Sequence, residues 1–383
     1  MTYFSTRNSS RPFTATAKLV RIHWPVLLTT CVLAAIGTIT LYSVSGGSFQ
    51  PWAERHTLRF LVALAIVVAM ALVRLEVWIK LSYPAYAVAL LMLALVPVFG
   101  VEALGAKRWI EIGQLSFQPS ELMKFALVAA LARYYLWLPT DRVGRWQYVL
   151  LPLLMVLVPV LLTLKQPDLG SAMVFLALGL ALMFLAGVPR AYFAVAAVLA
   201  FAALPVIWSG LHDYQRRRIE VFLDPGMDPL GAGYHITQSK IALGSGGISG
   251  KGFMQGTQSQ LDFVPEKHTD FIASIIGEEW GFTGLLFLIA AYAALIAMMT
   301  AMAWRSENRY AQLVIAGSAT SFFIYVFVNL AMVTGLVPVV GIPLPLVSYG
   351  GTAMTTLMVG LGLAMSGYVH GRESRRSNLG PFW

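Results

Sequence analysis

The sequence predicts an all-α integral membrane protein with about ten transmembrane helices, and two observations support this prediction. The chain of 383 residues is 58% hydrophobic and only 12% charged, with a mean hydropathy of +0.71, whereas a soluble domain has about 25% charged residues. Its apolar residues also come in runs of helical length, as a membrane-crossing helix requires. Neither a β-barrel, with its short alternating segments, nor a large soluble helical protein fits this pattern.

The apolar runs are taken in order along the chain. The polar stretch before Trp24 leads into a run long enough to span, which predicts an uncleaved signal-anchor rather than a removed signal peptide. The second span is short, and Pro84 favours a kink in the third. The expected spans are residues 24–44, 58–73, 77–99, 122–138, 148–164, 172–188, 192–208, 281–303, 314–333 and 351–369.

The short loops predict the orientation of these spans. If the N-terminus is cytoplasmic, most arginines and lysines of the short loops fall on the cytoplasmic side, and few fall on the outer side. This asymmetry predicts an N-in, C-in protein. The chain is then a single polytopic membrane domain, 1–383, with cytoplasmic tails at 1–22 and 371–383 and a large extracytoplasmic loop at 209–270, between spans seven and eight.

The large loop is unusually basic for an outer segment, since it carries Arg216, Arg217, Arg218, Lys240, Lys251 and Lys267. Cations held there favour an anionic, lipid-borne ligand. The alternative is a solvated basic loop beside anionic lipid headgroups. The net charge of +9 is thus explained by topology and this loop, and no nucleic-acid partner is indicated.

Glycine and proline residues indicate tight turns within the loop. Between them, Ile236, Ile241 and Leu243 have the spacing of a short amphipathic helix. The glycine-rich run 244–252 is able in principle to hold a phosphate through backbone N–H groups. It matches no nucleotide-binding fingerprint, so this signal is weak.

Asp270 lies where the loop meets the next apolar run, in the segment Glu266-Lys267-His268-Thr269-Asp270-Phe271. At such a boundary the pKa of a carboxyl group rises toward neutrality, which suits a general base or acid. The alternative is an N-cap for the following helix. His268 either shares the proton or makes a hydrogen bond, and the second is favoured. Composition does not rank Asp262 or Glu266 below Asp270.

A second candidate is the segment Gln118-Pro119-Ser120-Glu121-Leu122-Met123-Lys124. Glu121 and Lys124 are three residues apart and therefore share a helix face. An ionisable pair inside a span is by default a functional hypothesis, and the alternative is a structural ion pair. Upstream, Lys107, Arg108 and Trp109 form an expected interfacial segment.

Three further positions stand out. Asp168 lies in a turn between spans five and six, where it also suits a helix cap. Ser348 lies in the proline- and glycine-rich stretch 343–351, which fits an extended or re-entrant loop lining a cavity. Asn329, within the ninth span, is expected to join neighbouring helices.

No metal site is predicted. The six histidines show no pair at ligand spacing, and the single cysteine, Cys31, excludes an intramolecular disulfide and a thiolate cluster. Cofactor fingerprints are absent from the sequence. A divalent cation, Mg²⁺ or Mn²⁺, held loosely with a pyrophosphate substrate would leave no signature.

Taken in order, these motifs resemble the SEDS family (shape, elongation, division and sporulation) of bacterial cell-wall polymerases. The resemblance covers nearly the whole chain, and it is closest to the members that serve elongation, through the stretches 229–242 and 252–263. Its motifs are Gly105-Ala-Lys-Arg-Trp-Ile, Gln118-Pro-Ser-Glu-Leu-Met-Lys124, Gln166-Pro-Asp-Leu-Gly170, His268-Thr-Asp-Phe271 and Pro345-Leu-Val-Ser-Tyr-Gly-Gly351.

The resemblance implies a peptidoglycan glycosyltransferase of the bacterial cytoplasmic (inner) membrane that polymerises lipid II and releases undecaprenyl pyrophosphate. By position, Asp270 is the implied catalytic residue, and Glu121 with Lys124 the pair in the membrane cavity. Arg216, Arg217, Arg218 or Lys251 is expected to stabilise the departing charge. A class B penicillin-binding protein, a transpeptidase, is the implied partner.

Two alternatives stay open at this point. A flippase for lipid II or another lipid-linked sugar would also place ionisable residues such as Glu121 and Lys124 inside the membrane. A non-catalytic scaffold for the transpeptidase predicts that Asp270 is dispensable for polymer synthesis. Asp270 favours the polymerase, because it is expected at the outer boundary, where a flippase has less need of a titratable group.

Overall fold

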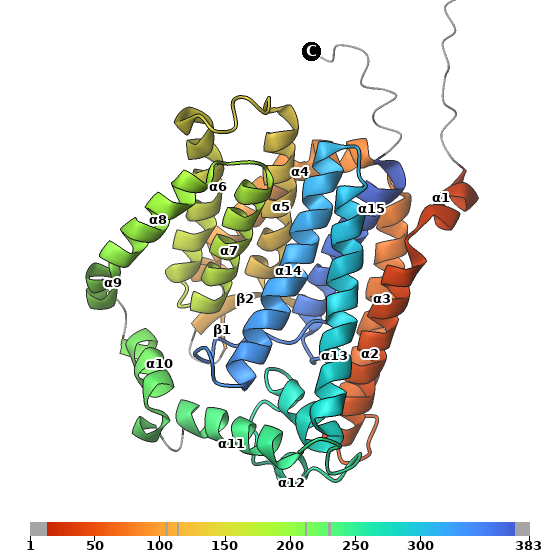
Figure 1. The fold of residues 1–383 in the computed structure, drawn as a ribbon, viewed down its shortest axis with the longest axis vertical. Coiled ribbons are helices and arrows are strands. Elements are labelled where there is room, and N and C mark those ends of the chain that lie inside the picture. Colours follow the sequence, from red (N-terminus) through yellow and green to blue (C-terminus); the bar gives the residue numbers. More distant parts are fainter. Residues whose placement is uncertain (1–13, 104–105, 113–114, 211–212, 229–230, 372–383) are drawn as a thin grey trace, which may run out of the picture.

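The computed structural model describes residues 14–103, 106–112, 115–210, 213–228 and 231–371, and helices dominate it (Figure 1). Its first half contains α1 (Ala15–Arg21), α2 (Trp24–Val44), α3 (Trp52–Leu72), α4 (Leu75–Phe99), α5 (Pro119–Trp137), α6 (Trp146–Leu164), α7 (Leu169–Leu185), α8 (Arg190–Ala202) and α9 (Leu204–Gly210). The second half contains α10 (Asp213–Leu223), the 3₁₀ turn η1 (Pro225–Met227), α11 (Ala232–Ser245), α12 (Thr257–Gln260), α13 (Ile272–Trp304), α14 (Arg309–Val333) and α15 (Gly351–His370).

The ten predicted spans all correspond to helices in the described part of the chain. Seven of these are long and apolar enough to cross a membrane, namely α2, α3, α4, α6, α13, α14 and α15. The other three are α5, which carries Glu121, Lys124 and Arg133, and the shorter α7 and α8. The second span is longer than predicted, because α3 begins at Trp52 and includes the charged residues Glu54, Arg55 and Arg59.

The predicted seventh span, 192–208, is wrong as a single helix. It is divided into α8 and α9 at Ala203. Pro205 explains the division, because proline lacks an N–H group and its ring collides with the carbonyl four residues earlier. Pro84, by contrast, is accommodated within the continuous helix α4.

The ends of the bundle differ in character. In Figure 1, α1 and the C-terminal end of α15 lie at one end, whereas α10, α11 and α12 lie at the other. The short helix predicted here is present as α11, which contains Ile236, Ile241 and Leu243, but Ile236 is buried and Ile241 is exposed, so these residues do not share one covered face. Residues 1–13 and 372–383, the larger part of the two predicted tails, lie outside the described residues.

A small sheet departs from the predicted all-α architecture. The strands β1 (Val101–Ala103), β2 (Ala106–Ile112) and β3 (Leu115–Phe117) pair in antiparallel order β1-β2-β3 between α4 and α5. Lys107, Arg108 and Trp109 therefore lie on a strand, where an interfacial segment of unspecified structure was expected.

Helix α13 is broken at Gly281, whose backbone has φ 67° and ψ −162°. Residues 247–252 of the glycine-rich run pair with the backbone at the break. Lys251 and Gly252 donate their N–H groups to the carbonyls of Glu278 and Glu279 (3.0 Å each), while Phe282 and Thr283 donate to the carbonyls of Gly247 (2.9 Å) and Ile248 (3.1 Å). A phosphate cradle built on the N–H groups of residues 251 and 252 is therefore ruled out, because both groups are bonded within the protein.

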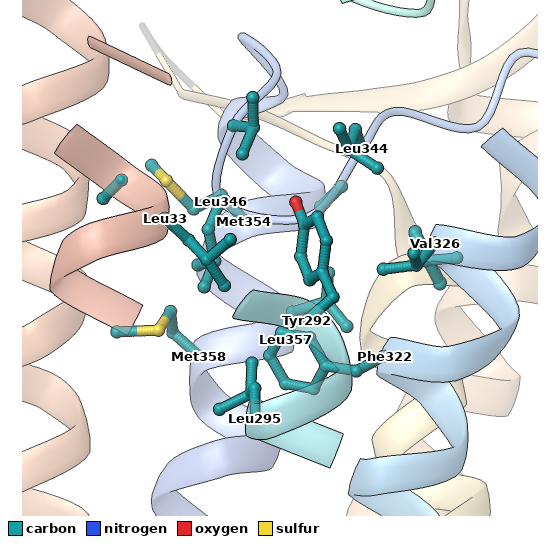
Figure 2. Close-up of a cluster of buried hydrophobic side chains, with 14 of the residues drawn as sticks. Leu33, Tyr292, Leu295, Phe322, Val326, Leu344, Leu346, Met354, Leu357 and Met358 are labelled. Atoms are coloured by element: carbon teal, nitrogen blue, oxygen red, sulfur yellow. The ribbon is translucent and has the colours of Figure 1, made fainter. Parts of the chain in front are cut away.

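Two apolar clusters make up the core. One lies among α2, α3, α13, α14 and α15, and the other among α4, α5, α6 and α7 with part of α14. Figure 2 shows the first cluster, where Tyr292 stands among Leu295, Phe322 and Leu357 and donates its hydroxyl hydrogen to the carbonyl of Pro345. The loop between α14 and α15 is thereby anchored to the bundle.

Candidate active site

A buried ion pair lies at the start of α5. Pro119 occupies the first turn of this helix, where its missing N–H group costs nothing. One turn on, Lys124 Nζ lies 2.6 Å from Glu121 Oε1, and the two residues are 2% and 6% exposed. The predicted pair is thus confirmed as a contact. A buried charge pair needs further hydrogen bonds to offset the loss of water.

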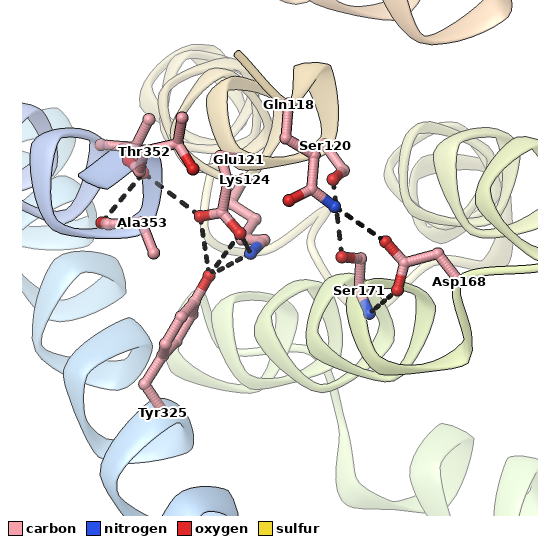
Figure 3. A network of polar contacts seen from close by, with 10 residues as sticks. Gln118, Ser120, Glu121, Lys124, Asp168, Ser171, Tyr325, Thr352 and Ala353 are labelled. Atoms are coloured by element: carbon pink, nitrogen blue, oxygen red, sulfur yellow. Dashed lines mark hydrogen bonds and ion pairs between the residues drawn. The ribbon is translucent and has the colours of Figure 1, made fainter. Parts of the chain in front are cut away.

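Two residues from other helices supply these hydrogen bonds (Figure 3). Tyr325 of α14 donates its hydroxyl to Glu121 Oε2 (2.9 Å) and receives a hydrogen bond from Lys124 Nζ. Thr356 of α15 donates to Glu121 Oε2 at 3.2 Å. The network therefore joins α5, α14 and α15, and the sequence did not point to Tyr325 or Thr356.

A second network joins the starts of α5 and α7. Asp168 accepts the N–H of Ser171 at 3.1 Å and so caps α7, which confirms the cap interpretation. Its other oxygen accepts from Gln118 Nε2 at 3.1 Å. Ser171 Oγ lies 3.5 Å from Ser120 Oγ. Since Ser120 precedes Glu121, this network lies beside the ion pair in Figure 3.

The three predicted interfacial residues reach this region only in part. Arg108 donates from Nη2 to the carbonyl of Pro167, next to Asp168. Lys107 is exposed, and Trp109 is half-buried. Only Arg108 among the three is thus tied to the second network.

Asp270 lies half-buried immediately before α13, which begins at Ile272 with Phe271 at the cap position. The sequence alternative of Asp270 as the N-cap is therefore not what the structure shows. Its backbone carbonyl accepts from Asn329 Nδ2 at 2.8 Å. Its carboxylate oxygen Oδ2 lies over Gly341, 3.5 Å from where a Cβ would be. Two loops thus meet at Asp270: the one before α13 and the one before α15.

Aromatic rings surround the loop that carries Asp270. The His268 ring stacks on Trp52 of α3 with centroids 4.2 Å apart, and its carbonyl accepts the N–H of Tyr349 at 2.8 Å. Burial lowers the pKa of the His268 imidazole, and the nearby Glu266 carboxylate opposes this effect. The lowered pKa favours the neutral imidazole, and the ring packs against Trp52. His235 of α11, which the sequence did not single out, stacks on Phe271 at 6.0 Å.

Ser348 closes the loop between α14 and α15. It is 2% exposed, and its Oγ accepts the N–H of Leu344 at 2.8 Å. The neighbouring Tyr349 ring lies 4.9 Å from the Arg59 guanidinium carbon. Ser348 thus shapes the loop, and the cation beside it comes from α3.

The basic residues of the large loop are divided among several segments, with Arg216 and Arg217 together on α10, Lys240 on α11 and Lys251 between α11 and α12. Arg216 donates from Nη2 to the Trp208 carbonyl at 3.2 Å, and Arg217 lies 3.7 Å from Asp228, with its side chain 69% exposed. Lys251 lies 2.7 Å from Glu278, which is fully buried. The side chain of Arg218 lies outside the described part of the structure. The cations therefore do not form one cluster among the described residues.

The Asp270 loop is also tied to the broken helix. Glu278 accepts the backbone N–H groups of Gln258 (2.9 Å) and Ser259 (3.1 Å). Lys267 in turn donates to the Ser259 carbonyl at 2.6 Å. The described residues contain no group of three or more His, Cys, Asp and Glu side chains placed to hold a metal ion.

Comparison with known proteins gives consistent matches over most of the chain. Residues 23–372 match the family model for the FtsW, RodA and SpoVE cell cycle proteins. The chain is 40% identical to the peptidoglycan glycosyltransferase MrdB of Escherichia coli K12, over 92% of this chain and 95% of that protein. It is 34% identical to a probable peptidoglycan glycosyltransferase FtsW of Trichlorobacter lovleyi, over 89% and 91%.

Solved structures show the same likeness. One, described as "Structural coordination of polymerization and crosslinking by a peptidoglycan synthase complex", matches with a TM-score of 0.80 and 32% identity, over 94% of this chain and 99% of that one. The rod shape determining protein RodA of Thermus thermophilus matches with a TM-score of 0.67 and 29% identity, over 94% and 98%.

Proposed function

Because the chain belongs to the FtsW, RodA and SpoVE family of cell cycle proteins and, like its relatives, is a peptidoglycan glycosyltransferase, we propose that it polymerises lipid II during cell elongation, with Asp270 as general base. One observation carries the choice of Asp270. It is a half-buried carboxylate at the meeting point of two loops, and its own loop follows α12, which lies with α11 at one end of the bundle in Figure 1.

The proposed topology has ten spans with both termini in the cytoplasm and the large loop outside. The arrangement of α1 and the end of α15 at one end of the bundle, opposite α10 to α12, supports it. Asp270 would then face the outer side of the bacterial inner membrane, where a lipid-linked disaccharide is accessible.

The proposed reaction is a single displacement. Asp270 accepts the proton of the acceptor's sugar 4-hydroxyl, and the oxygen attacks the anomeric carbon of the donor as undecaprenyl pyrophosphate leaves. An α-linked pyrophosphate thereby becomes a β-glycosidic bond. Inversion needs a base but no carboxylate nucleophile, so one carboxylate at this position is sufficient.

The departing pyrophosphate needs positive charge, and the large loop supplies the candidates. Arg217 is an accessible candidate, since its side chain is 69% exposed, whereas Lys251 is engaged by Glu278. Charge reversal at Arg217 should lower polymerisation, and an unaffected rate would contradict this role. A divalent cation carried by the pyrophosphate belongs to the same proposal, and a chelator would then abolish activity.

The Glu121–Lys124 pair is proposed to support the packing of α5 against α14 and α15. Both charges are held by Tyr325, and Glu121 also by Thr356. Groups that pass a substrate or a proton along a transport path must exchange partners, and an ion pair only 2% and 6% exposed, bonded to side chains of α14 and α15, does not favour such exchange. It thus favours a polymerase over a flippase.

A class B penicillin-binding protein is the proposed partner. One solved structure that this chain resembles is a peptidoglycan synthase complex whose description joins polymerisation with crosslinking. Crosslinking is the reaction of a transpeptidase. The polymerase would supply glycan strands to that partner in the membrane.

The direct test uses purified, labelled lipid II with the protein and its transpeptidase partner, comparing the wild type with Asp270→Asn. Asparagine preserves size but does not accept a proton at neutral pH. Polymer from the wild type alone would support Asp270 as the base. Equal polymer from both proteins would sink that assignment, and no polymer from either would favour a flippase or a scaffold.

A further inference from the structure

Asn329 of α14 has a role that its position within an apolar helix does not suggest. It is fully buried, and an asparagine at such a place commonly joins two helices. Instead, its amide nitrogen bonds two loops. Nδ2 donates to the carbonyl of Asp270 at 2.8 Å and to the carbonyl of Ile342, also at 2.8 Å.

These two carbonyls belong to the two segments that meet at the Asp270 carboxylate. One belongs to the backbone that carries the carboxylate. The other belongs to the residue after Gly341, over which Asp270 Oδ2 lies. Gly341 has φ +72°, a conformation that favours glycine. The Asn329 side chain therefore fixes both the backbone of Asp270 and the segment at Gly341 that the Asp270 carboxylate contacts.

The chemistry of the amide group suits this task. A primary amide has two N–H donors on one planar, uncharged nitrogen, so both carbonyls are satisfied without burying a charge. Serine offers one donor, and an ionised aspartate offers none. Leaving either carbonyl unpaired in a buried place would destabilise the loop that held it.

We propose that Asn329 is a positioning residue that holds the Asp270 carboxylate in its reactive place, an inference that rests on Asp270 being the general base. Catalysis is sensitive to such placement, since a displacement of about 1 Å can lower the rate about 100-fold. The loop keeps a second tie, the hydrogen bond from the Tyr349 N–H to the His268 carbonyl at 2.8 Å. Loss of Asn329 should therefore shift Asp270 without releasing the whole loop.

The test compares Asn329→Asp and Asn329→Ser with the wild type in steady-state polymerisation of lipid II, using the full chain with its transpeptidase partner. Asn329→Asp keeps the shape and removes both donors. We expect kcat to fall about 100-fold while KM stays within about twofold. Asn329→Ser keeps one donor, so its kcat should lie between those of the wild type and Asn329→Asp. It serves as the second variant if Asn329→Asp does not fold.

Ser318→Ala provides the matched control. Ser318 is also buried on α14, and its Oγ lies within hydrogen-bond distance of the carbonyls of Val314 (2.9 Å) and Gly360 (3.0 Å), away from both loops. Its loss should lower thermal stability and leave kcat unchanged. A structural role alone would make Asn329→Ser behave like this control, and wild-type kcat in either folded Asn329 variant would overturn the proposal.

The Asp270→Asn variant separates the two hypotheses. If it is inactive and the Asn329 variants keep full kcat, the positioning role fails alone. If Asp270→Asn retains full activity, the proposed general base fails, and with it the route by which Asn329 was to act.

Discussion

Removing Lys124 should destabilise the protein strongly, because it would leave the Glu121 carboxylate charged and buried. Breaking a buried ion pair by removing one partner costs about 3–5 kcal/mol. Glu121 would still accept hydrogen bonds from Tyr325 (2.9 Å) and Thr356 (3.2 Å), so the lower end, about 3 kcal/mol, is expected for Lys124→Met. The free energy of unfolding, measured by denaturant titration in detergent micelles, checks this value.

The double variant Glu121→Gln with Lys124→Met makes the test decisive. It removes both charges and keeps similar volumes, so its stability should return to within about 1 kcal/mol of the wild type. Thr356→Val is the control, since it removes one hydrogen bond to Glu121, from a hydroxyl that also contacts the carbonyls of Thr352 and Ala353, and leaves both charges in place. It should cost about 1 kcal/mol. A double variant as unstable as the sum of its single variants would refute the reasoning, because the two charges would then be energetically independent.

Three further outcomes are expected. Backbone strain at a residue such as Gly281 costs about 1–3 kcal/mol when glycine is replaced. Gly281→Ala should destabilise the protein by more than this, because its Cβ would also lie 2.3 Å from the Gly250 nitrogen. An unchanged thermal midpoint would contradict this expectation. Glu278→Gln should speed hydrogen exchange in α12, whose N–H groups Glu278 accepts, and leave exchange in α14 unchanged. Burial lowers the pKa of His268 in the folded state, so its contribution to stability is present above the unfolded pKa of about 6.5 and is lost as pH falls through the folded pKa. In His268→Phe, which retains an aromatic ring beside Trp52, the loss of stability between pH 7.5 and 5.5 should be smaller.

The sequence predicts the parts of the site that depend on local spacing. Glu121 and Lys124 are three residues apart on one helix, and Asp168 precedes the helix that it caps. Tyr325 was missed because its contact is with residues some 200 positions away, and a tyrosine in an apolar run is easily taken for core. A signal was present, however, since a buried tyrosine hydroxyl usually needs a partner.

The small sheet was missed for a different reason. Its outer strands are three residues long, too short for alternation to be recognised beside strongly apolar helices. Gly105 and Gly113, which bound β2 on either side in the sequence, are typical turn residues and were the available signal. Apolar composition predicts where the long helices lie, but it does not predict the structure of the short segments at their ends.

The break in α13 gives the glycine-rich run a structural role. A helix interrupted at Gly281 frees two carbonyls and two N–H groups, and unpaired backbone groups at the edge of a membrane cost several kcal/mol each. Residues 247–252 pair with all four. Glycine is needed at 250 because a Cβ there would lie 2.2 Å from the Glu279 carbonyl oxygen. The composition that suits a phosphate cradle equally suits a close approach between two backbones.

This pairing has a consequence for Asp270. The first turns of α13, the glycine-rich run and α12 are held together by backbone bonds and by the buried carboxylate of Glu278. Lys267 attaches the Asp270 loop to α12 through the Ser259 carbonyl, and Asn329 attaches it to α14. The carboxylate is therefore fixed from two sides by groups far apart in sequence. A change that loosens only one side should lower the rate of catalysis before it unfolds the protein.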